Sequence, residues 1–456
     1  MRIKIELFVG IVLFFCFVVT GFFGASIALS SDDLINPRGS DTGGNVWYGE
    51  GAGGSIRFAS DNSFFGMSAG SLTTDGNSNS FFGKDTGFKN TTGHDNSFFG
   101  SSAGYLNTTG TANSFFGHSA GYNNTATENT FMGANAGFKN TTGYANSFFG
   151  SGAGIENITG EANSFFGMNA GYNNTTGYAN SFFGRYAGYH NNGYRNTFVG
   201  MTAGYENIGG YDNTFLGMNA GHKNLSGNQN TFLGRAAGYA NNAGNYNTFV
   251  GYGAGNLNNS GSDNTFIGHG AGWTNTNGSG NVFLGYKAGY QEKGHNKLYV
   301  DNSNINNPLI WGDFENNNII IYGGFRAIAI SSPSDERLKK NIKPLESSLD
   351  KISNLQGVTY EWNREDYPDA GMTEGKQIGL VAQDVEKEIP ELVSEDKDGY
   401  KAVSYTKLTA VLVEAVKELK SENQSQKKLI EEQRNQFTKQ QAEIEELRSM
   451  IKASKG

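Results

Sequence analysis

A pattern of five polar and apolar positions recurs fourteen times in the first two thirds of the chain: Asn, Ser or Thr, Phe, a second bulky apolar residue, and Gly. Consecutive copies are 17 residues apart, except that the steps ending at Asn129 and Asn196 are 16 residues long; Val282 replaces the Ser or Thr of the last copy. The leading asparagines are Asn62, Asn79, Asn96, Asn113, Asn129, Asn146, Asn163, Asn180, Asn196, Asn213, Asn230, Asn247, Asn264 and Asn281. A unit this short cannot bury a core alone, so each copy must stack on its neighbours.

Each repeat is expected to form a short strand, a tight Ala-Gly corner such as Ala69-Gly70, a second extended stretch, and a turn such as Asn90-Thr91-Thr92-Gly93. Gly and Asn tolerate positive φ and therefore suit places where a coil turns sharply. One coil per repeat predicts a mostly β fold, a parallel β-roll or β-solenoid, over residues 61–290. At about 4.8 Å per rung, fourteen rungs would make a rod of about 65 Å.

The paired apolar residues suggest that several chains pack together. Neighbours in a strand point to opposite faces, so Phe64 and Phe65 cannot both fill one narrow core. The first position is Phe in all fourteen copies, and the second varies among Phe, Met, Val, Leu and Ile. If the first column fills the coil, the second forms an apolar stripe that a soluble monomer rarely exposes, and parallel chains around an axis would bury it. A wider solenoid with both columns internal is the alternative.

The first 28 residues have the composition of a signal peptide. Arg2 and Lys4 precede the apolar stretch Leu7 to Phe23, and small residues follow at Ser26 to Ala28. Cleavage would send the protein to the cell surface or into the medium; a retained membrane anchor is the alternative. The only cysteine, Cys16, lies in the apolar stretch, so the mature chain would contain none.

Two further segments flank the repeats. Residues 29–60 are a polar, Gly-rich lead-in without a clear period, and residues 291–333 are a connector with strand-like runs at Lys297 to Val300, Pro308 to Trp311 and Asn318 to Tyr322. Such shifts of composition usually mark domain boundaries.

The overall composition excludes several classes of protein. A net charge of -8 gives no reason to expect a nucleic-acid partner. The 65 glycines lack the third-residue period of collagen, and 13% aromatic residues recurring in register are unlike a disordered chain. The repeats carry neither the recurrent Asp of calcium-binding rolls nor a recurrent carboxylate pair for glycoside hydrolysis, so no metal and no cofactor is expected.

Two features of the repeats allow a binding role and a simpler structural one. Four Asn-Thr-Thr sequences are formal glycosylation acceptors, although a turn explains them more simply; they begin at Asn90, Asn107, Asn140 and Asn174. Aromatic residues that follow the Ala-Gly corner could stack on sugars, although stacking between rungs is the simpler interpretation; examples are Tyr105, Phe138, Tyr172, Tyr189 and Trp273.

The C-terminal third carries a series of motifs in a fixed order: Ser334 to Ile342, Val358 to Trp362, Ile378 to Val385, Pro390 to Val393, and Val403 to Tyr405. In order and spacing they resemble the intramolecular chaperone domain of phage tailspikes and tail fibres, the endosialidase type. The repeats, in turn, resemble the head β-rolls of trimeric autotransporter adhesins. These resemblances imply a trimeric β-structured shaft followed by an α+β chaperone domain over residues 334–407.

The chaperone resemblance also implies that the domain assists trimer assembly and then cuts itself off between Pro333 and Ser334. Ser334 would be the nucleophile and Lys339 its general base, with Asp335 orienting the site or capping a helix and with Gln383 and Asp384 in support. A neutral lysine can take a proton from a serine hydroxyl if burial lowers its pKa. The structural alternative is that Ser334 is a helix N-cap, and a proline before the scissile bond restricts the backbone there.

Residues 408–452 carry six heptads in phase, which predict a coiled coil. Position a holds Val416, Asn423, Ile430, Phe437, Ile444 and Ile451. Position d holds Leu412, Leu419, Gln426, Gln433, Gln440 and Leu447. An amphipathic helix lying on the chaperone domain is the alternative.

Together these patterns predict an exported, homotrimeric, fibre-like surface protein whose only enzymatic activity is self-cleavage as a serine peptidase. Its rod would bind a surface glycan or a host protein. The alternatives are a structural adhesin that keeps an uncut C-terminal stalk, a glycan hydrolase, and a phage tail fibre, against which the apolar N-terminus argues.

Overall fold

The computed structural model describes residues 43–304, 307–323, 325–328, 333–367, 372, 374–395 and 399–454. It divides into two compact units, residues 1–320 and 321–456, and each is considered by itself. The expected signal peptide, its Cys16 and most of the lead-in lie outside the described residues. Within the described part, no helix is long and apolar enough to cross a bilayer.

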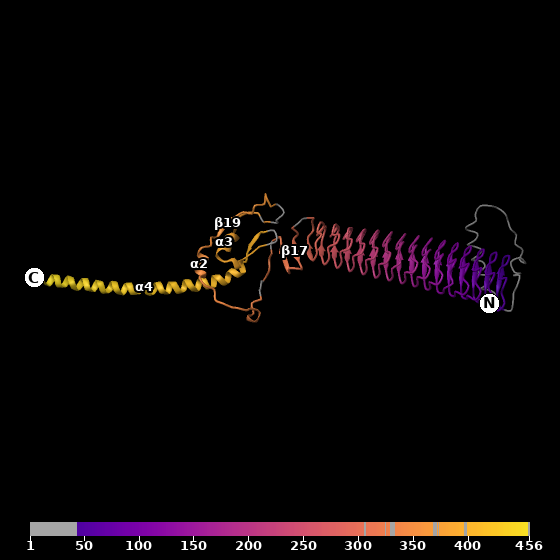
Figure 1. The fold of residues 1–456 in the computed structure, drawn as a ribbon, viewed down its shortest axis with the longest axis horizontal. Coiled ribbons are helices and arrows are strands. Elements are labelled where there is room, and N and C mark those ends of the chain that lie inside the picture. The colour runs from indigo at the N-terminus through magenta and orange to yellow at the C-terminus, as the bar shows by residue number, and fades with distance from the viewer. Residues whose placement is uncertain are drawn as a thin grey trace, which may run out of the picture. The chain divides into compact units, whose positions relative to one another are not determined.

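The first unit is a parallel β-solenoid, the regular ladder of rungs in Figure 1. Each strand pairs in parallel with the next, residue for residue, so that Phe64 lies beside Phe81 and Phe81 beside Phe98. The strands are β1 (Val46–Tyr48), β2 (Ser63–Phe65), β3 (Ser80–Phe82), β4 (Ser97–Phe99), β5 (Ser114–Phe116), β6 (Thr130–Met132), β7 (Ser147–Phe149), β8 (Ser164–Phe166), β9 (Ser181–Phe183), β10 (Thr197–Val199), β11 (Thr214–Leu216), β12 (Thr231–Leu233), β13 (Thr248–Val250), β14 (Thr265–Ile267), β15 (Val282–Leu284) and β16 (Lys297–Val300). The predicted fold of the repeats is confirmed.

The first apolar column fills the interior of the coil. All fourteen of its phenylalanines, from Phe64 to Phe283, are fully buried, and neighbouring rings stack with centroids 4.5–4.9 Å apart. Burying each ring contributes about 1.5–3 kcal/mol. The second column is only partly covered: Phe65 is 37% exposed and Leu216 43%. The wider solenoid with both columns internal is therefore wrong.

The glycine of the Ala-Gly corner leaves room for the buried phenylalanine ring of the same rung. A Cβ on Gly70, whose φ is +58°, would lie 2.6 Å from the Phe64 ring, so only glycine fits. The stretch after the corner is a series of turns and contains no strand, unlike the extended stretch expected there. It still bonds to the next rung, as in the 3.0 Å contact from the Leu72 N–H to the Phe88 carbonyl. The aromatic residues in this stretch stack between rungs, as Tyr105 does on Tyr122 at 4.9 Å, which confirms the simpler interpretation.

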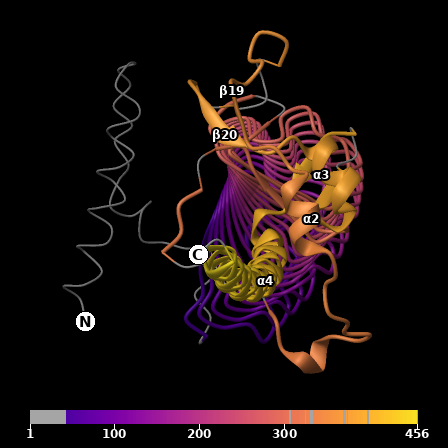
Figure 2. The same ribbon diagram turned by 90° about the vertical axis from the view of Figure 1, so that its left-hand side faces the viewer.

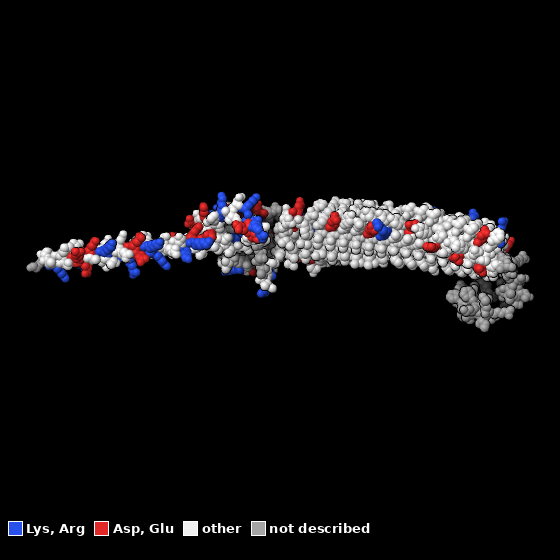
Figure 3. Space-filling view, turned by 90° about the horizontal axis from the view of Figure 1, so that it is seen from below, with Lys and Arg blue, Asp and Glu red and all other residues white. Residues whose placement is uncertain are grey.

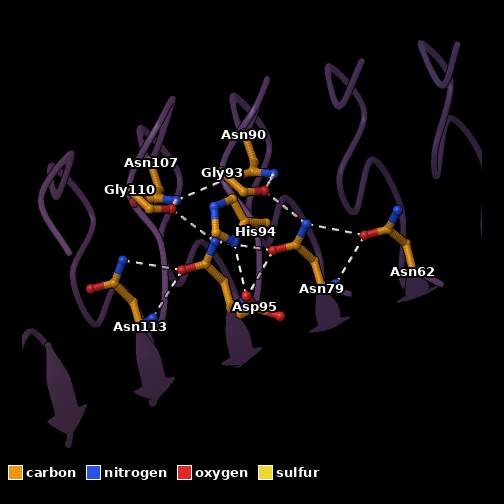
Figure 4. Close-up of polar contacts among 10 residues, drawn as sticks. Asn62, Asn79, Asn90, Gly93, His94, Asp95, Asn107, Gly110 and Asn113 are labelled. Carbon is orange, nitrogen blue, oxygen red and sulfur yellow. Dashed lines mark hydrogen bonds and ion pairs between the residues drawn. The ribbon is translucent and has the colours of Figure 1, made fainter. Parts of the chain in front are cut away.

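Buried asparagines form two hydrogen-bonded columns along the coil, shown in Figure 4. In the first, Asn62 Oδ1 accepts both the backbone N–H of Asn79 at 2.9 Å and its side-chain amide at 3.0 Å. In the second, Asn107 donates to Asn90 Oδ1 at 3.1 Å, and Asn90 donates to the Gly93 carbonyl at 2.9 Å, closing the turn. These side chains satisfy backbone groups that would otherwise be buried without partners. All four candidate glycosylation asparagines are fully buried in this second column, which confirms the turn interpretation.

The ladder is one rung longer at each end than the sequence predicts. Strand β1 pairs with β2, and Trp47 occupies the place of the core phenylalanine. At the other end β16 pairs with β15. Strand β17 (Ile310–Asp313) then runs antiparallel to β16, with a 3.0 Å ion pair between Lys297 and Asp313. Strand β18 (Asn318–Ile321) belongs to the same sheet. The three strands expected in the connector are present; the first has the expected bounds, and the other two are shifted by one or two residues at their ends.

The second unit is a small α+β domain that continues into a long helix. Its elements are η1 (Glu336–Leu338), α2 (Ser348–Ser353), β19 (Val358–Tyr360), β20 (Gln377–Gly379), α3 (Ala382–Glu388), η3 (Pro390–Leu392), β21 (Val393–Glu395), β22 (Lys401–Val403) and α4 (Tyr405–Ala453). Strands β19 and β20 form one antiparallel hairpin and β21 and β22 another. Figure 2 shows α2 and α3 beside α4, where Val385, Ile389 and Leu392 pack against Val411.

Only the first turns of α4 pack on the domain, through Val411 and Ala415. Residues 419–454 are exposed, so the alternative in which the helix lies along the chaperone domain is wrong for this part. The expected helix is confirmed. Its pairing with other chains as a coiled coil remains a prediction.

Candidate functional site

The residues of the candidate self-cleavage site lie at the start of the second unit. One turn of 3-10 helix, η1, lies between Ser334 and Lys339 and brings the two side chains together: Lys339 Nζ donates to Ser334 Oγ at 2.8 Å. This is the distance over which a serine hydroxyl can pass its proton to an amine. The five-residue spacing of the sequence therefore becomes a direct contact in the structure.

Asp335 is the N-cap of this turn. Its Oδ1 accepts the Arg337 N–H at 2.9 Å, and its two oxygens bind the Arg337 guanidinium at 3.0 and 2.8 Å. The Arg337 hydrogen bonds lower the pKa of the Asp335 carboxyl and, reciprocally, raise the pKa of Arg337. The capping role expected of Asp335 is thus present, whereas the alternative that Ser334 is the cap is wrong.

Ser334 and Lys339 are both exposed. A lysine acts as a base at neutral pH only when burial or a cationic neighbour favours its neutral form. The described part of this single chain supplies the contact between the two side chains but not the burial. Ser334 Oγ and the peptide bond that joins it to Pro333 are therefore open to any group that packs over them.

Gln383 and Asp384 are exposed on α3, whereas Val385, the next residue of the helix, is buried. Asp384 Oδ1 accepts from Lys387 Nζ at 2.8 Å, and this contact raises the pKa of Lys387. Among the described residues, no hydrogen bond or ion pair joins Gln383 or Asp384 to Ser334 or Lys339. The sequence motifs thus place these two residues on the domain but not at the serine–lysine contact.

The other motifs build the domain around α4. The Leu380 N–H donates to the Tyr405 hydroxyl at 2.9 Å, and a Cβ on Gly379 would lie 2.8 Å from that oxygen, which explains the Ile-Gly-Leu sequence here. Sequence reasoning missed Glu418. From α4, its carboxylate accepts the Ser348 and Leu349 N–H groups at 3.1 and 2.7 Å and so caps α2. A glutamate in the middle of a charged helix gives no local signal of this role.

Comparison with known proteins agrees with this assignment of the domain. Residues 334–394 match the family model described as chaperone of endosialidase, and the match begins at Ser334. The chain is 39% identical over 110 residues to the long tail fiber protein Gp37 of Enterobacteria phage K3 and, equally, to that of phage T2; each alignment covers 23% of this chain and 9% or 8% of the relative. The protein of the same name from Enterobacteria phage Ox2 is 35% identical over 104 residues, 22% of this chain and 40% of the relative.

The chain thus spans less than half the length of these relatives. Its C-terminal segment carries a chaperone-of-endosialidase domain and is homologous to phage long tail fibre proteins, and the domain follows a β-solenoid. The expectation that the apolar N-terminus disfavours a phage tail fibre is corrected by this homology to tail fibre proteins. The N-terminal residues that gave rise to it lie outside the described structure.

Proposed function

We propose that this chain forms a homotrimeric fibre displayed at a surface, and that the domain beginning at Ser334 assembles the trimer and then severs itself from the shaft. The observation that carries the proposal is the 2.8 Å contact between Lys339 Nζ and Ser334 Oγ at the first residue of the matched domain.

Unpaired apolar columns in both units support trimer assembly. On the rod, the second column is only partly covered. On α4, the heptad residues Ile430, Phe437 and Ile444 are 50–60% exposed in the single chain. On the face in Figure 3, charged side chains are sparse over the rod and frequent along α4, as expected for a helix with a charged exterior and an apolar seam. Three parallel copies would bury both columns.

The proposed cleavage needs no reactant from outside the chain except water. Ser334 Oγ attacks the carbonyl carbon of Pro333 while neutral Lys339 takes the hydroxyl proton; the C–N bond then breaks, and the amine of Ser334 leaves with a proton returned by the lysine. Water hydrolyses the resulting ester, giving a Pro333 carboxylate and a free Ser334 hydroxyl. Because Lys339 is exposed in the single chain, we propose that packing of the chains in the trimer supplies the burial that makes it neutral.

Intact-mass analysis of the purified protein tests the cleavage, with sedimentation to give the number of chains. We expect a fragment beginning at Ser334 from the unaltered protein and from the control Lys340→Arg. Ser334→Ala and Lys339→Arg should stay whole, because an arginine cannot give up its proton.

An uncut chain in a trimeric sample of the unaltered protein would refute self-cleavage and support the alternative, a structural adhesin that keeps its C-terminal stalk. An uncut monomer would refute the trimer proposal. Export is tested separately by deleting residues 1–28 and measuring how much protein reaches the medium or the cell surface.

A further inference from the structure

The solenoid contains rungs with a shortened turn, and one of them lies near the middle of the repeats. In the rung that begins at Asn180, the turn is Asn191-Asn192-Gly193, with three residues. The rungs on either side have four, Asn174 to Gly177 and Asn207 to Gly210. The missing residue is the one removed by the 16-residue step that ends at Asn196.

A groove of about 340 Å³ lies at this turn. It is lined by Asn173 from the preceding rung, His190 and Asn192 from the short rung, and Glu206 and Ile208 from the following rung. Because the lining comes from the short rung and its two neighbours, we attribute the groove to the missing turn residue.

The side chains on one wall of the groove are held in place. Asn192 Oδ1 accepts the Thr175 N–H at 2.8 Å and the Thr175 hydroxyl at 2.7 Å. In a full-length turn a backbone carbonyl is the acceptor instead, as the Thr108 carbonyl is for the N–H of Thr91 at 2.9 Å. The Asn192 amide thus replaces backbone that the short turn lacks, and this fixes its orientation.

His190 is similarly fixed at the groove. Its Nδ1 lies 2.8 Å from Asn173 Nδ2, and its ring packs edge-on against Tyr189 and Tyr205, with centroids 4.7 and 5.5 Å away. Both tyrosines belong to the stacked column that runs along the rod. A polar side chain so constrained loses little conformational freedom when it binds a ligand.

Glu206 brings a carboxylate that has no cationic partner within 4.0 Å among the described residues. Lys223 is 17 residues further on, in the same column of the next rung, yet the two form no ion pair. The equivalent pair, Lys139 and Glu156, forms an ion pair at 2.8 Å. Glu206 instead lines the groove, so its oxygens are available to accept hydrogen bonds there.

We propose that this groove binds a neutral saccharide, an assignment that rests on the display role proposed for the rod. A carboxylate, two amides and an imidazole offer the mixed acceptors and donors that a row of hydroxyl groups needs, and Ile208, 53% exposed, offers an apolar surface beside them. No lysine or arginine is among the lining residues, which disfavours phosphate, sulfate and acidic sugars.

A second short rung provides a natural comparison; a third, the rung that begins at Asn281, has the turn Glu292-Lys293-Gly294. The rung that begins at Asn113 also has a three-residue turn, Asn124-Thr125-Ala126. The position that corresponds to Glu206 is Lys139 there, and it is already paired with Glu156. The same shortening therefore occurs without an available carboxylate, and we expect no saccharide binding at that turn.

The test measures binding of the full-length protein to lactose, maltotriose, chitotriose and mannotriose, with sialyllactose as the acidic probe, by saturation-transfer NMR followed by calorimetry. Glu206→Ala should weaken binding of a neutral probe about tenfold or more, because a charged hydrogen-bonding group is lost. The matched control Glu156→Ala, in the same column but outside the groove, should bind as the unaltered protein does.

A second pair of variants tests the shape of the groove. Inserting one threonine after Asn192 restores a 17-residue rung and should abolish binding, whereas inserting one after Thr125 lengthens the short rung that begins at Asn113 and should leave binding unchanged. Absence of binding to all neutral probes, binding only to sialyllactose, or equal binding by Glu206→Ala would overturn the proposal. Sedimentation of the same samples separates this failure from failure of the proposed function, because an assembled trimer that binds no sugar contradicts only the groove.

Discussion

Substitution of a single buried asparagine should open the solenoid locally. The Asn163 side chain makes four hydrogen bonds: it donates to Asn146 Oδ1 at 3.2 Å and to the Gly177 carbonyl at 2.8 Å, and its Oδ1 accepts the backbone N–H and the side-chain amide of Asn180 at 3.0 and 3.1 Å. Asn163→Ala removes all four.

The size of the effect follows from what remains bonded. The Gly177 carbonyl keeps its bond from Asn174 at 2.8 Å, and the Asn180 side chain keeps its bond to the Gly193 carbonyl at 2.9 Å. The backbone N–H of Asn180 is left without a hydrogen-bond acceptor. An orphaned buried N–H costs about 1–3 kcal/mol, and each lost hydrogen bond that leaves no orphan costs about 0.5–1.5 kcal/mol. One orphaned N–H and three such hydrogen bonds give a total of about 2.5–7.5 kcal/mol.

Hydrogen exchange followed by mass spectrometry is the suitable assay, because a repeat array need not unfold in one step and exchange reports local opening free energies. Peptides that cover residues 163–180 should lose protection by the stated amount, and rungs far along the rod should be unchanged. Asn242→Ala, at an exposed asparagine of the same rod, is the matched control. An opening free energy for Asn163→Ala within 0.5 kcal/mol of the unaltered protein would refute the view that the asparagine columns hold the rungs together.

Two further substitutions each test one contact, the first in the second unit and the second in the first unit. Glu418→Ala should remove the cap of α2 and lower the opening free energy of residues 348–353 by about 1 kcal/mol, measured by hydrogen exchange; an unchanged value would contradict the capping role. Asp313 has a pKa lowered from 3.8 to about 2, chiefly by hydrogen bonds from Asn316 and Lys297. A lowered folded pKa stabilises the hairpin above pH 3.8, and this stabilisation disappears as the pH falls to about 2. In Asp313→Asn the hairpin should no longer lose stability over this range, as measured by its resistance to limited proteolysis by pepsin between pH 4 and pH 2. A pH profile identical to that of the unaltered protein would refute the role of Asp313.

Most of the solenoid could be predicted because its structure follows from the sequence pattern within each repeat. The period, the buried Phe column and the Ala-Gly corner each follow from strand alternation and from the space a glycine leaves. The extra rung at β1 was missed because Trp47 and Tyr48 replace the expected residues, although Asn45 and Gly49 keep the pattern 17 residues before Asn62.

The candidate site was only partly predictable. The spacing of Ser334 and Lys339 agrees with their contact at 2.8 Å, but the choice of Asp335 over Ser334 as the cap required the backbone geometry of η1. Glu418 reaches α2 across about 70 residues of sequence, as the contact with Ser348 shows, and no local pattern encodes such a contact.

The sequence by itself determined the repeat, its register and the division of the chain, because stacking identical units forces equivalent residues into columns. Only the tertiary structure decided which apolar column is buried, how the short turn at Asn192 opens a groove, and that Ser334 and Lys339 meet on an exposed surface. These outcomes depend on distances between segments that are remote in sequence, and such distances are set by packing rather than by local preference.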